Sequence, residues 1–168
     1  MVNTRYLLTL ALLAGTCLAQ TPESTKEPAR FYKLDFVVKE LDGSRVVNAR
    51  TYSTTASTEE RSGCAIRTGS KVQVGAPGAS ATANVDVGVN IDCRSIKEVR
   101  NELSMSVTAD ITSMAQESTT SSAYPVIRQN RWSSNVIVPI RKSSVIFSSD
   151  DTTSKHQMQV ELTATPIP

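Results

Sequence analysis

The chain has 168 residues, with 18 Lys plus Arg, 16 Asp plus Glu and a formal net charge of +2 at pH 7. This near balance provides no basic patch for a phosphate backbone, and an aromatic content of 5% is too small for a base-stacking platform. We therefore expect no nucleic-acid partner. The length fits one small folded domain.

Residues 1–19 have the three parts of a secretory signal peptide. Arg5 makes the start basic, an apolar run of about ten residues follows, and the small residue Ala19 precedes Gln20. A membrane-spanning helix needs about 20 apolar residues. The pattern predicts cleavage between Ala19 and Gln20 and an exported protein, whether periplasmic, extracellular or associated with the outer membrane.

A second interpretation of this segment stays open. The residues Leu13-Ala14-Gly15-Thr16-Cys17 are similar to a bacterial lipobox, although Thr16 replaces the usual Gly, Ala or Ser. A lipid on Cys17 would convert a free protein into one tethered to a membrane.

Residues 20–30 are polar, contain two prolines and show no hydrophobic period, which predicts a flexible lead-in. Residues 31–168 are predicted to form a single all-β domain. Alternation of apolar and polar residues begins at Tyr32, and Asp42-Gly43 predicts a type I′ hairpin turn into a second strand over 44–55.

Alternation continues along most of the remaining chain. Further strands are predicted over 64–74, 85–93, 103–111, 126–138, 143–149 and 155–165. The segment from Ser95 to Leu103 is expected to be a turn with a charged rim, and residues 113–124 a polar loop. About seven or eight short strands of this kind predict an antiparallel β-sandwich or a partly open barrel.

The two cysteines of the predicted domain provide a test of strand register. If Cys64 lies opposite Cys93 in an antiparallel pair, Ile66 lies opposite Ile91 and Val72 opposite Val85, so the apolar faces coincide. In an exported protein the pair predicts a disulfide. Two buried thiols that pack as small hydrophobic groups are the alternative.

The sequence shows no constellation for catalysis. His156 is the single histidine, and it shares the parity of an apolar strand face near the strand's end, which is typical of a rim residue. No Gly-x-Ser-x-Gly motif is present. We expect a protein that is not an enzyme and needs no cofactor.

Three further features have weaker functional interpretations. Asp150-Asp151 fits a calcium loop, although acidic residues are far commoner in hairpin turns. Gly75 and Gly78 lack phosphate-loop spacing and are expected to be turn residues. Trp132 shares parity with apolar neighbours, which favours a core anchor over a sugar-stacking platform. We expect no metal site.

The order of several motifs resembles the secretin core domain over about residues 64–167. Residues 66–74 are similar to its Val-Gly-x-x-Val-Pro-Val strand, and residues 86–92 to its Asp-x-Gly-x-x-Leu-x-Val strand. The later matches, in the same order as in the family, are Leu103–Ile111, Pro125-Val126-Ile127, Val136–Phe147 and Thr165-Pro166-Ile167.

The chain also departs from that family. Ser148-Ser149-Asp150 stands where secretins have Gly-Gly-Leu before a tight bend, and no N-terminal secretin module or membrane lip is evident. The resemblance implies a secretin-like strand order more than a working pore.

Three functions are consistent with these observations. The first is a non-catalytic β-domain of the bacterial envelope that binds protein partners through strand edges and the loop 113–124. The second is a small eight-stranded outer-membrane β-barrel, against which the scarcity of aromatic residues argues. The third is a carbohydrate-binding module or hydrolase. Membrane association is expected only with a lipid on Cys17 or with the barrel.

Overall fold

The computed structural model describes residues 28–74, 83–115, 126–150 and 155–168. These residues form eight β-strands: β1 (Phe31–Asp42), β2 (Arg45–Ser57), β3 (Gly63–Val74), β4 (Ala83–Val99), β5 (Glu102–Ala115), β6 (Val126–Pro139), β7 (Ser144–Asp150) and β8 (His156–Ile167). In the part of the chain that is described, no helix is long and apolar enough to span a membrane.

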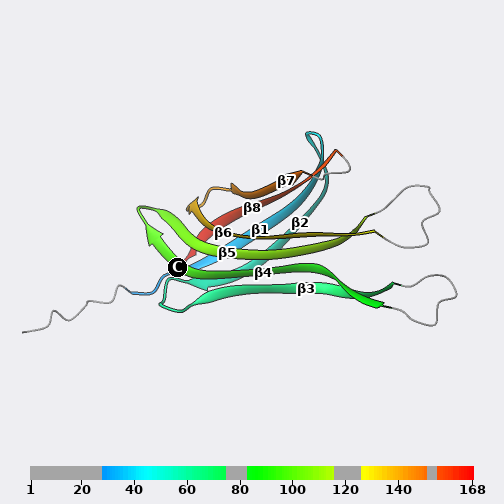
Figure 1. Cartoon of the computed structure of the whole chain (residues 1–168). Helices are drawn as coiled ribbons and strands as arrows, with labels where there is room; N and C mark the ends of the chain where they lie inside the picture. The colour runs from blue at the N-terminus through cyan, green and yellow to red at the C-terminus, as the bar shows by residue number, and fades with distance from the viewer. Residues whose placement is uncertain (1–27, 75–82, 116–125, 151–154) are drawn as a thin grey trace, which may run out of the picture.

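The strands make two four-stranded antiparallel sheets, with the orders β2-β1-β8-β7 (sheet A) and β3-β4-β5-β6 (sheet B). The sheets face each other and do not close into one barrel (Figure 1). The predicted all-β sandwich is therefore confirmed.

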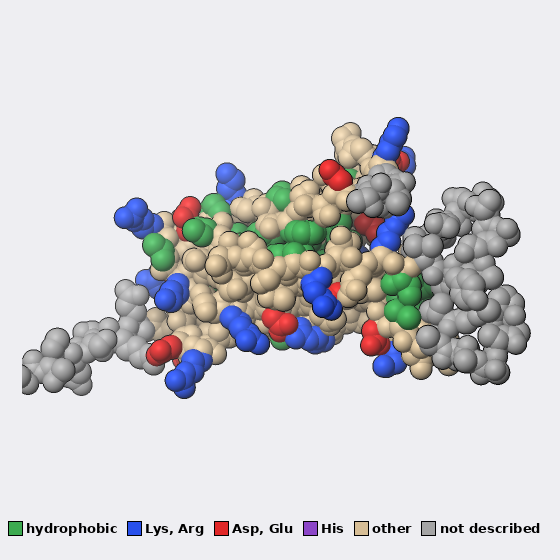
Figure 2. Space-filling model, in the orientation of Figure 1, with side chains coloured by type: hydrophobic (Ala, Val, Ile, Leu, Met, Phe, Trp, Pro, Cys, Tyr) green, Lys and Arg blue, Asp and Glu red, His purple; other side chains and the backbone are tan. Residues whose placement is uncertain are grey.

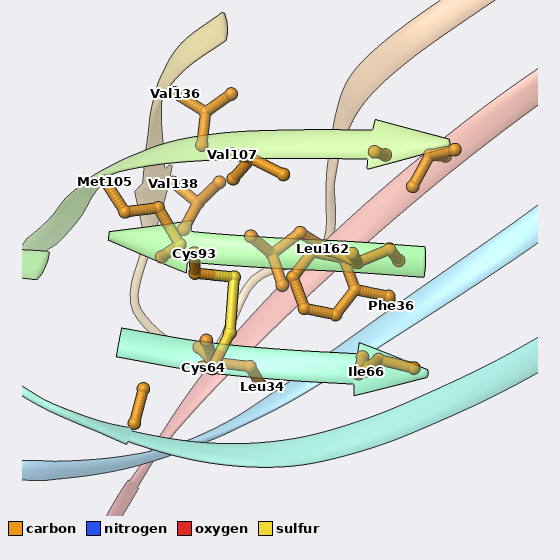
Figure 3. Close-up of a cluster of buried hydrophobic side chains, with 14 of the residues drawn as sticks. Leu34, Phe36, Cys64, Ile66, Cys93, Met105, Val107, Val136, Val138 and Leu162 are labelled. Atoms are coloured by element: carbon orange, nitrogen blue, oxygen red, sulfur yellow. A yellow bond between two sulfur atoms is a disulfide. The ribbon is translucent and has the colours of Figure 1, made fainter. Parts of the chain in front are cut away.

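The core lies between the sheets because the alternating apolar residues of both point inward. Figure 3 shows Leu34, Phe36 and Leu162 of sheet A meeting side chains of sheet B, among them Val107. Each of these four side chains has 0% relative exposure. The central strands β1, β8, β4 and β5 supply most of the buried residues.

The register predicted from the cysteines is confirmed. Cys64 pairs with Cys93 across β3 and β4, and the partners of Ile66 and Val72 are the predicted ones. A disulfide joins the two cysteines, whose Cα atoms are 4.9 Å apart. Both side chains lie in the core.

The first hairpin turn differs from the prediction. Asp42 pairs with Arg45, so the two turn residues are Gly43 and Ser44. Gly43 has a φ of 60°, but Ser44 does not have a positive φ. A positive φ at the first turn position alone is the pattern of a type II′ turn, whereas type I′ requires it at both.

The segment after Cys93 also differs from the prediction. β4 continues to Val99 instead of turning at Ser95, and a β-bulge interrupts its pairing with β5 between Arg94 and Lys97. Ser95 has a φ of 55° at this bulge. The extra residue reverses the parity of the strand, so Ile96 is buried and Glu98 points toward the inner face.

The polar loop predicted at 113–124 starts later than expected, because β5 extends to Ala115. Ser113 and Met114 pair with β6 residues. The rest of that segment lies outside the described residues.

Replacing both Cys64 and Cys93 by Ala is expected to lower the free energy of unfolding by about 3–4 kcal/mol, because the crosslink closes a loop of about 30 residues in the unfolded chain. Chemical denaturation of the purified protein measures this loss. Intact mass after alkylation without reductant checks the bond itself; labelling of both cysteines would show that the pair is not bonded.

Candidate functional site

The two sheets are joined by the chain at one end only. Residues 58–62 link β2 to β3, and residues 140–143 link β6 to β7. Both segments lie at what we call the closed end, together with the start of β1 and the turn between β4 and β5. At the opposite, open end, Gly43 and Ser44 turn the chain back within sheet A. Figure 1 shows the sheets diverging toward this open end.

The divergence leaves an inner cleft between the sheets. A hollow of about 980 Å³ lies there, with lining residues from both sheets. Val89, Ile111 and Met158 are its most buried lining residues. Inward positions of sheet A nearer the open end are polar: in β2, Tyr52 is half-buried but Arg50 is exposed, whereas Val72 and Val87 of sheet B line the hollow half-buried. The core ends where these polar inward residues begin.

A polar cluster fastens the sheets at the closed end. The Tyr32 hydroxyl of β1 and the Arg30 guanidinium both donate hydrogen bonds to the Glu98 carboxylate of β4, the latter at 2.7 Å. These bonds, that from Tyr32 foremost, lower the pKa of Glu98. Burial raises the pKa of Tyr32, and the hydrogen bond to Glu98 adds to that rise. The cluster exists because the bulge at Ser95 turns Glu98 inward.

Trp132 links the two sheets at the side formed by β6 and β7. Its ring stacks on Phe147 with 5.0 Å between the centroids and 5° between the planes. Its Nε1 is buried and has no hydrogen-bond partner among the described residues. The stacking supports the predicted anchoring role and covers one face of the ring that a sugar platform would need to expose.

On the other side, β2 and β3 are edge strands that separate toward the open end. All side chains from Arg45 to Thr51 in β2 are exposed, as are those from Arg67 to Lys71 in β3. Each strand is paired along one edge only within the described chain. Their other backbone edges are therefore available to a further strand.

Two of the remaining predicted residues, Asp150 and His156, line one hollow at the open end. His156 starts β8, is exposed, and lies at the inner cleft. Asp150 ends β7, where it accepts a hydrogen bond from Gln157 at 2.9 Å. Within the described ranges, no group of three or more His, Cys, Asp or Glu side chains is arranged to hold a metal ion.

Several predictions fall outside the described residues. They are the signal peptide with its Ala19–Gln20 cleavage site and Cys17, most of the lead-in, Gly75 and Gly78, most of the loop 113–124, and Asp151.

Sequence comparison identifies no relative: no family model matches the chain, and no curated protein matches it. Comparison of structures finds secretins. The InvG secretin domain β-barrel of the Salmonella SPI-1 injectisome has 12% sequence identity and a TM-score of 0.45, over 83% of this chain and 62% of that chain. The type II secretin GspD of enteropathogenic Escherichia coli has 8% identity and a TM-score of 0.45, over 83% and 66%.

The Vibrio cholerae type IV competence pilus secretin PilQ has 9% identity and a TM-score of 0.42, over 83% of this chain and 57% of that chain. The present chain thus spans less than two thirds of the length of each of these three secretin chains. The resemblance to the secretin β-domain predicted from the motifs is confirmed as a weak one.

Replacing Glu98 by Gln is expected to lower the free energy of unfolding by about 1–2 kcal/mol at pH 7, because a neutral amide oxygen accepts weaker hydrogen bonds from Tyr32 and Arg30 than the carboxylate does and the ion pair with Arg30 is lost. The pKa of Glu98 is lower in the folded than in the unfolded protein, so its contribution is present above about pH 4.3 and disappears as the pH falls through the folded-state pKa. Denaturation of both proteins between pH 7 and pH 2 measures this convergence.

Glu102→Gln is the matched control, since this exposed carboxylate lies at the start of β5, next to the turn that follows β4, and a change within about 0.5 kcal/mol is expected. An equal loss in both variants would contradict a specific role for Glu98.

Proposed function

We propose that this chain is an exported, non-catalytic β-domain of the bacterial envelope that binds other proteins through its open strand edges. The single observation that carries the proposal is the exposure, on both faces, of residues 45–51 of β2 and 67–71 of β3. Residues buried on neither face contribute little to a core, so these two segments are not kept extended by packing within the domain.

The composition of these edges favours selective pairing. Arg45 and Arg50 lie on β2, and on β3 Arg67 and Lys71 form ion pairs with Asp92 and Asp86 of β4. Charged side chains on edge strands oppose pairing with arbitrary β-chains, because a mismatched partner places like charges together. A partner with complementary charges can use the same backbone groups, which suits a protein that assembles with a defined neighbour.

The start of the sequence and the cysteine pair support the export part of the proposal. A signal peptide over 1–19 leads to an oxidising compartment, where a buried disulfide between Cys64 and Cys93 is stable. Such a bond is rare in proteins that stay in the cytosol. The carbohydrate-binding alternative loses its main candidate, because Trp132 stacks on Phe147.

Fractionation of cells that express the chain with its own leader tests export. The processed protein is expected in the periplasmic or medium fraction, with an N-terminus at Gln20 and no added lipid. Two results together would contradict a free envelope domain. The protein would be extracted from membranes only by detergent, and its N-terminus would be Gln20, so that Cys17 has been removed with the leader and carries no lipid.

Edge pairing is tested by a charge placed on the edge. In a pull-down with the tagged protein, Ser70→Asp on β3 is expected to reduce the recovered amount of a partner, or of further copies of the chain, by at least about tenfold. The reason is that a strand pairing at this edge would have to desolvate the added charge, which is costly. Native mass measurement of the captured material provides the readout.

Ser106→Asp on the central strand β5 is the matched control, because this residue is paired along both edges, with Arg94 of β4 and with Asn135 of β6. A strictly monomeric wild-type protein with no co-purifying partner would overturn the proposal, as would equal losses in the two variants.

A further inference from the structure

Three arginines at the closed end have an unusual backbone conformation. Arg61, Arg100 and Arg141 have φ angles of 69°, 51° and 65°, and each lies in a different turn. Arg61 is in the link between β2 and β3, Arg100 in the turn between β4 and β5, and Arg141 in the link between β6 and β7.

Chain geometry does not explain the choice of arginine at these positions. A positive φ is adopted most readily by Gly, and next by Asn, whereas a residue with a long side chain is strained there. Asn101, beside Arg100, shows the more usual choice with a φ of 65°. Strained conformations that persist are enriched at functional sites. The side chains themselves are therefore the feature to explain.

The three turns lie at the same end of the molecule. The Ile140 amide donates to the Asn101 carbonyl at 3.2 Å, which joins two of the turns. The Thr58 amide donates to the Arg30 carbonyl at 3.0 Å, which joins the third to the start of β1. Arg30 in turn bonds Glu98, two residues before Arg100.

The three guanidinium groups are exposed, and no described residue forms an ion pair or a hydrogen bond with them. The charge around them is positive. Segments 28–31, 58–63, 94–102, 139–143 and 164–168 contain seven basic side chains and four acidic ones. One of the four acids, Glu98, is already paired with Arg30.

Apolar side chains are exposed beside these arginines. Phe31 and Ile167 are cross-strand partners with 53% and 41% relative exposure. Val99, next to Arg100, is 53% exposed, and Ile137 is 64% exposed on the outer face of sheet B. Figure 2 shows basic side chains projecting at the left end of the molecule, which is the closed end, with hydrophobic side chains among them.

We infer that the closed end binds the surface of an anionic phospholipid bilayer. Arginines can reach the lipid phosphates while neighbouring apolar side chains enter the boundary between headgroups and acyl chains. The cationic and apolar groups come from both sheets and from three turns around the whole end. A broad distribution of this kind suits an extended surface better than a single acidic peptide, which would follow one groove.

The test uses the processed chain carrying Cys17→Ser in the precursor, so that no attached lipid contributes. Sedimentation with vesicles of phosphatidylcholine containing phosphatidylglycerol is expected to retain the protein at low salt, and neutral phosphatidylcholine vesicles are not. The triple variant Arg61→Asn, Arg100→Asn and Arg141→Asn is expected to bind about 100-fold more weakly, at about fivefold for each charge near the surface. Asn tolerates the positive φ, so the fold is preserved.

The matched control removes three positive charges at the open end by Arg45→Gln, Arg50→Gln and Lys155→Gln, and a change of less than about threefold is expected from charges remote from the bilayer. Equal weakening in both triple variants would overturn the inference, because net charge alone would then explain binding. The inference is also overturned if the wild-type protein does not bind the anionic vesicles but binds immobilised polyglutamate through the same three arginines. That result would indicate that the closed end binds an acidic protein.

Discussion

Packing between the two sheets is concentrated near the closed end, and the other features of the molecule depend on that constraint. Covalent links at residues 58–62 and 140–143 keep the sheets close there, so Leu34, Phe36 and Leu162 can be fully buried. Beyond those residues, only side-chain packing joins the sheets. The paired strands continue beyond that point, but in sheet A their inward residues become polar and line the inner cleft.

One residue at the closed end has consequences for both sheets. The bulge at Ser95 places an extra residue in β4 and reverses its alternation, so Ile96 fills the core and Glu98 reaches Tyr32. Without the bulge, a strand that kept the parity of Cys93 would present Lys97 to the core. A positive φ at Ser95 is the local cost of joining β4 to β1 by a hydrogen bond.

Local alternation predicted the strands well because burial on one face of a sheet requires it. The cysteine pair also predicted the register of β3 and β4, since a slip by one residue would have placed apolar side chains on the polar face. The sheet orders could not be predicted in this way. β1 lies between β2 and β8, and the pairing of Phe31 with Ile167 joins residues at opposite ends of the domain, for which no local pattern exists.

Features controlled by single backbone angles were also missed. The charged residues after Cys93 look like a turn, and nothing in their composition indicates a bulge that continues the strand. Asp42-Gly43 suggested a turn one residue earlier than the observed Gly43-Ser44, while Arg100-Asn101 forms a turn with two positive φ angles and contains no glycine. The inner cleft was likewise unpredicted, because polar residues at inward positions indicate exposure only when the distance between sheets is known.

The disulfide lies near the closed end, where the two sheets pack together, and not toward the open end, where they separate. Cys64 lies near the closed end of the edge strand β3 and is bonded to Cys93 in the inner strand β4. Farther along, from Arg67 to Lys71, β3 is exposed on both faces and is held mainly by its backbone pairing with β4. Edge strands fray most easily where packing is absent. A covalent bond at the start of this segment limits fraying while leaving the outer backbone edge of β3 unpaired, which is the condition that strand addition by a partner requires.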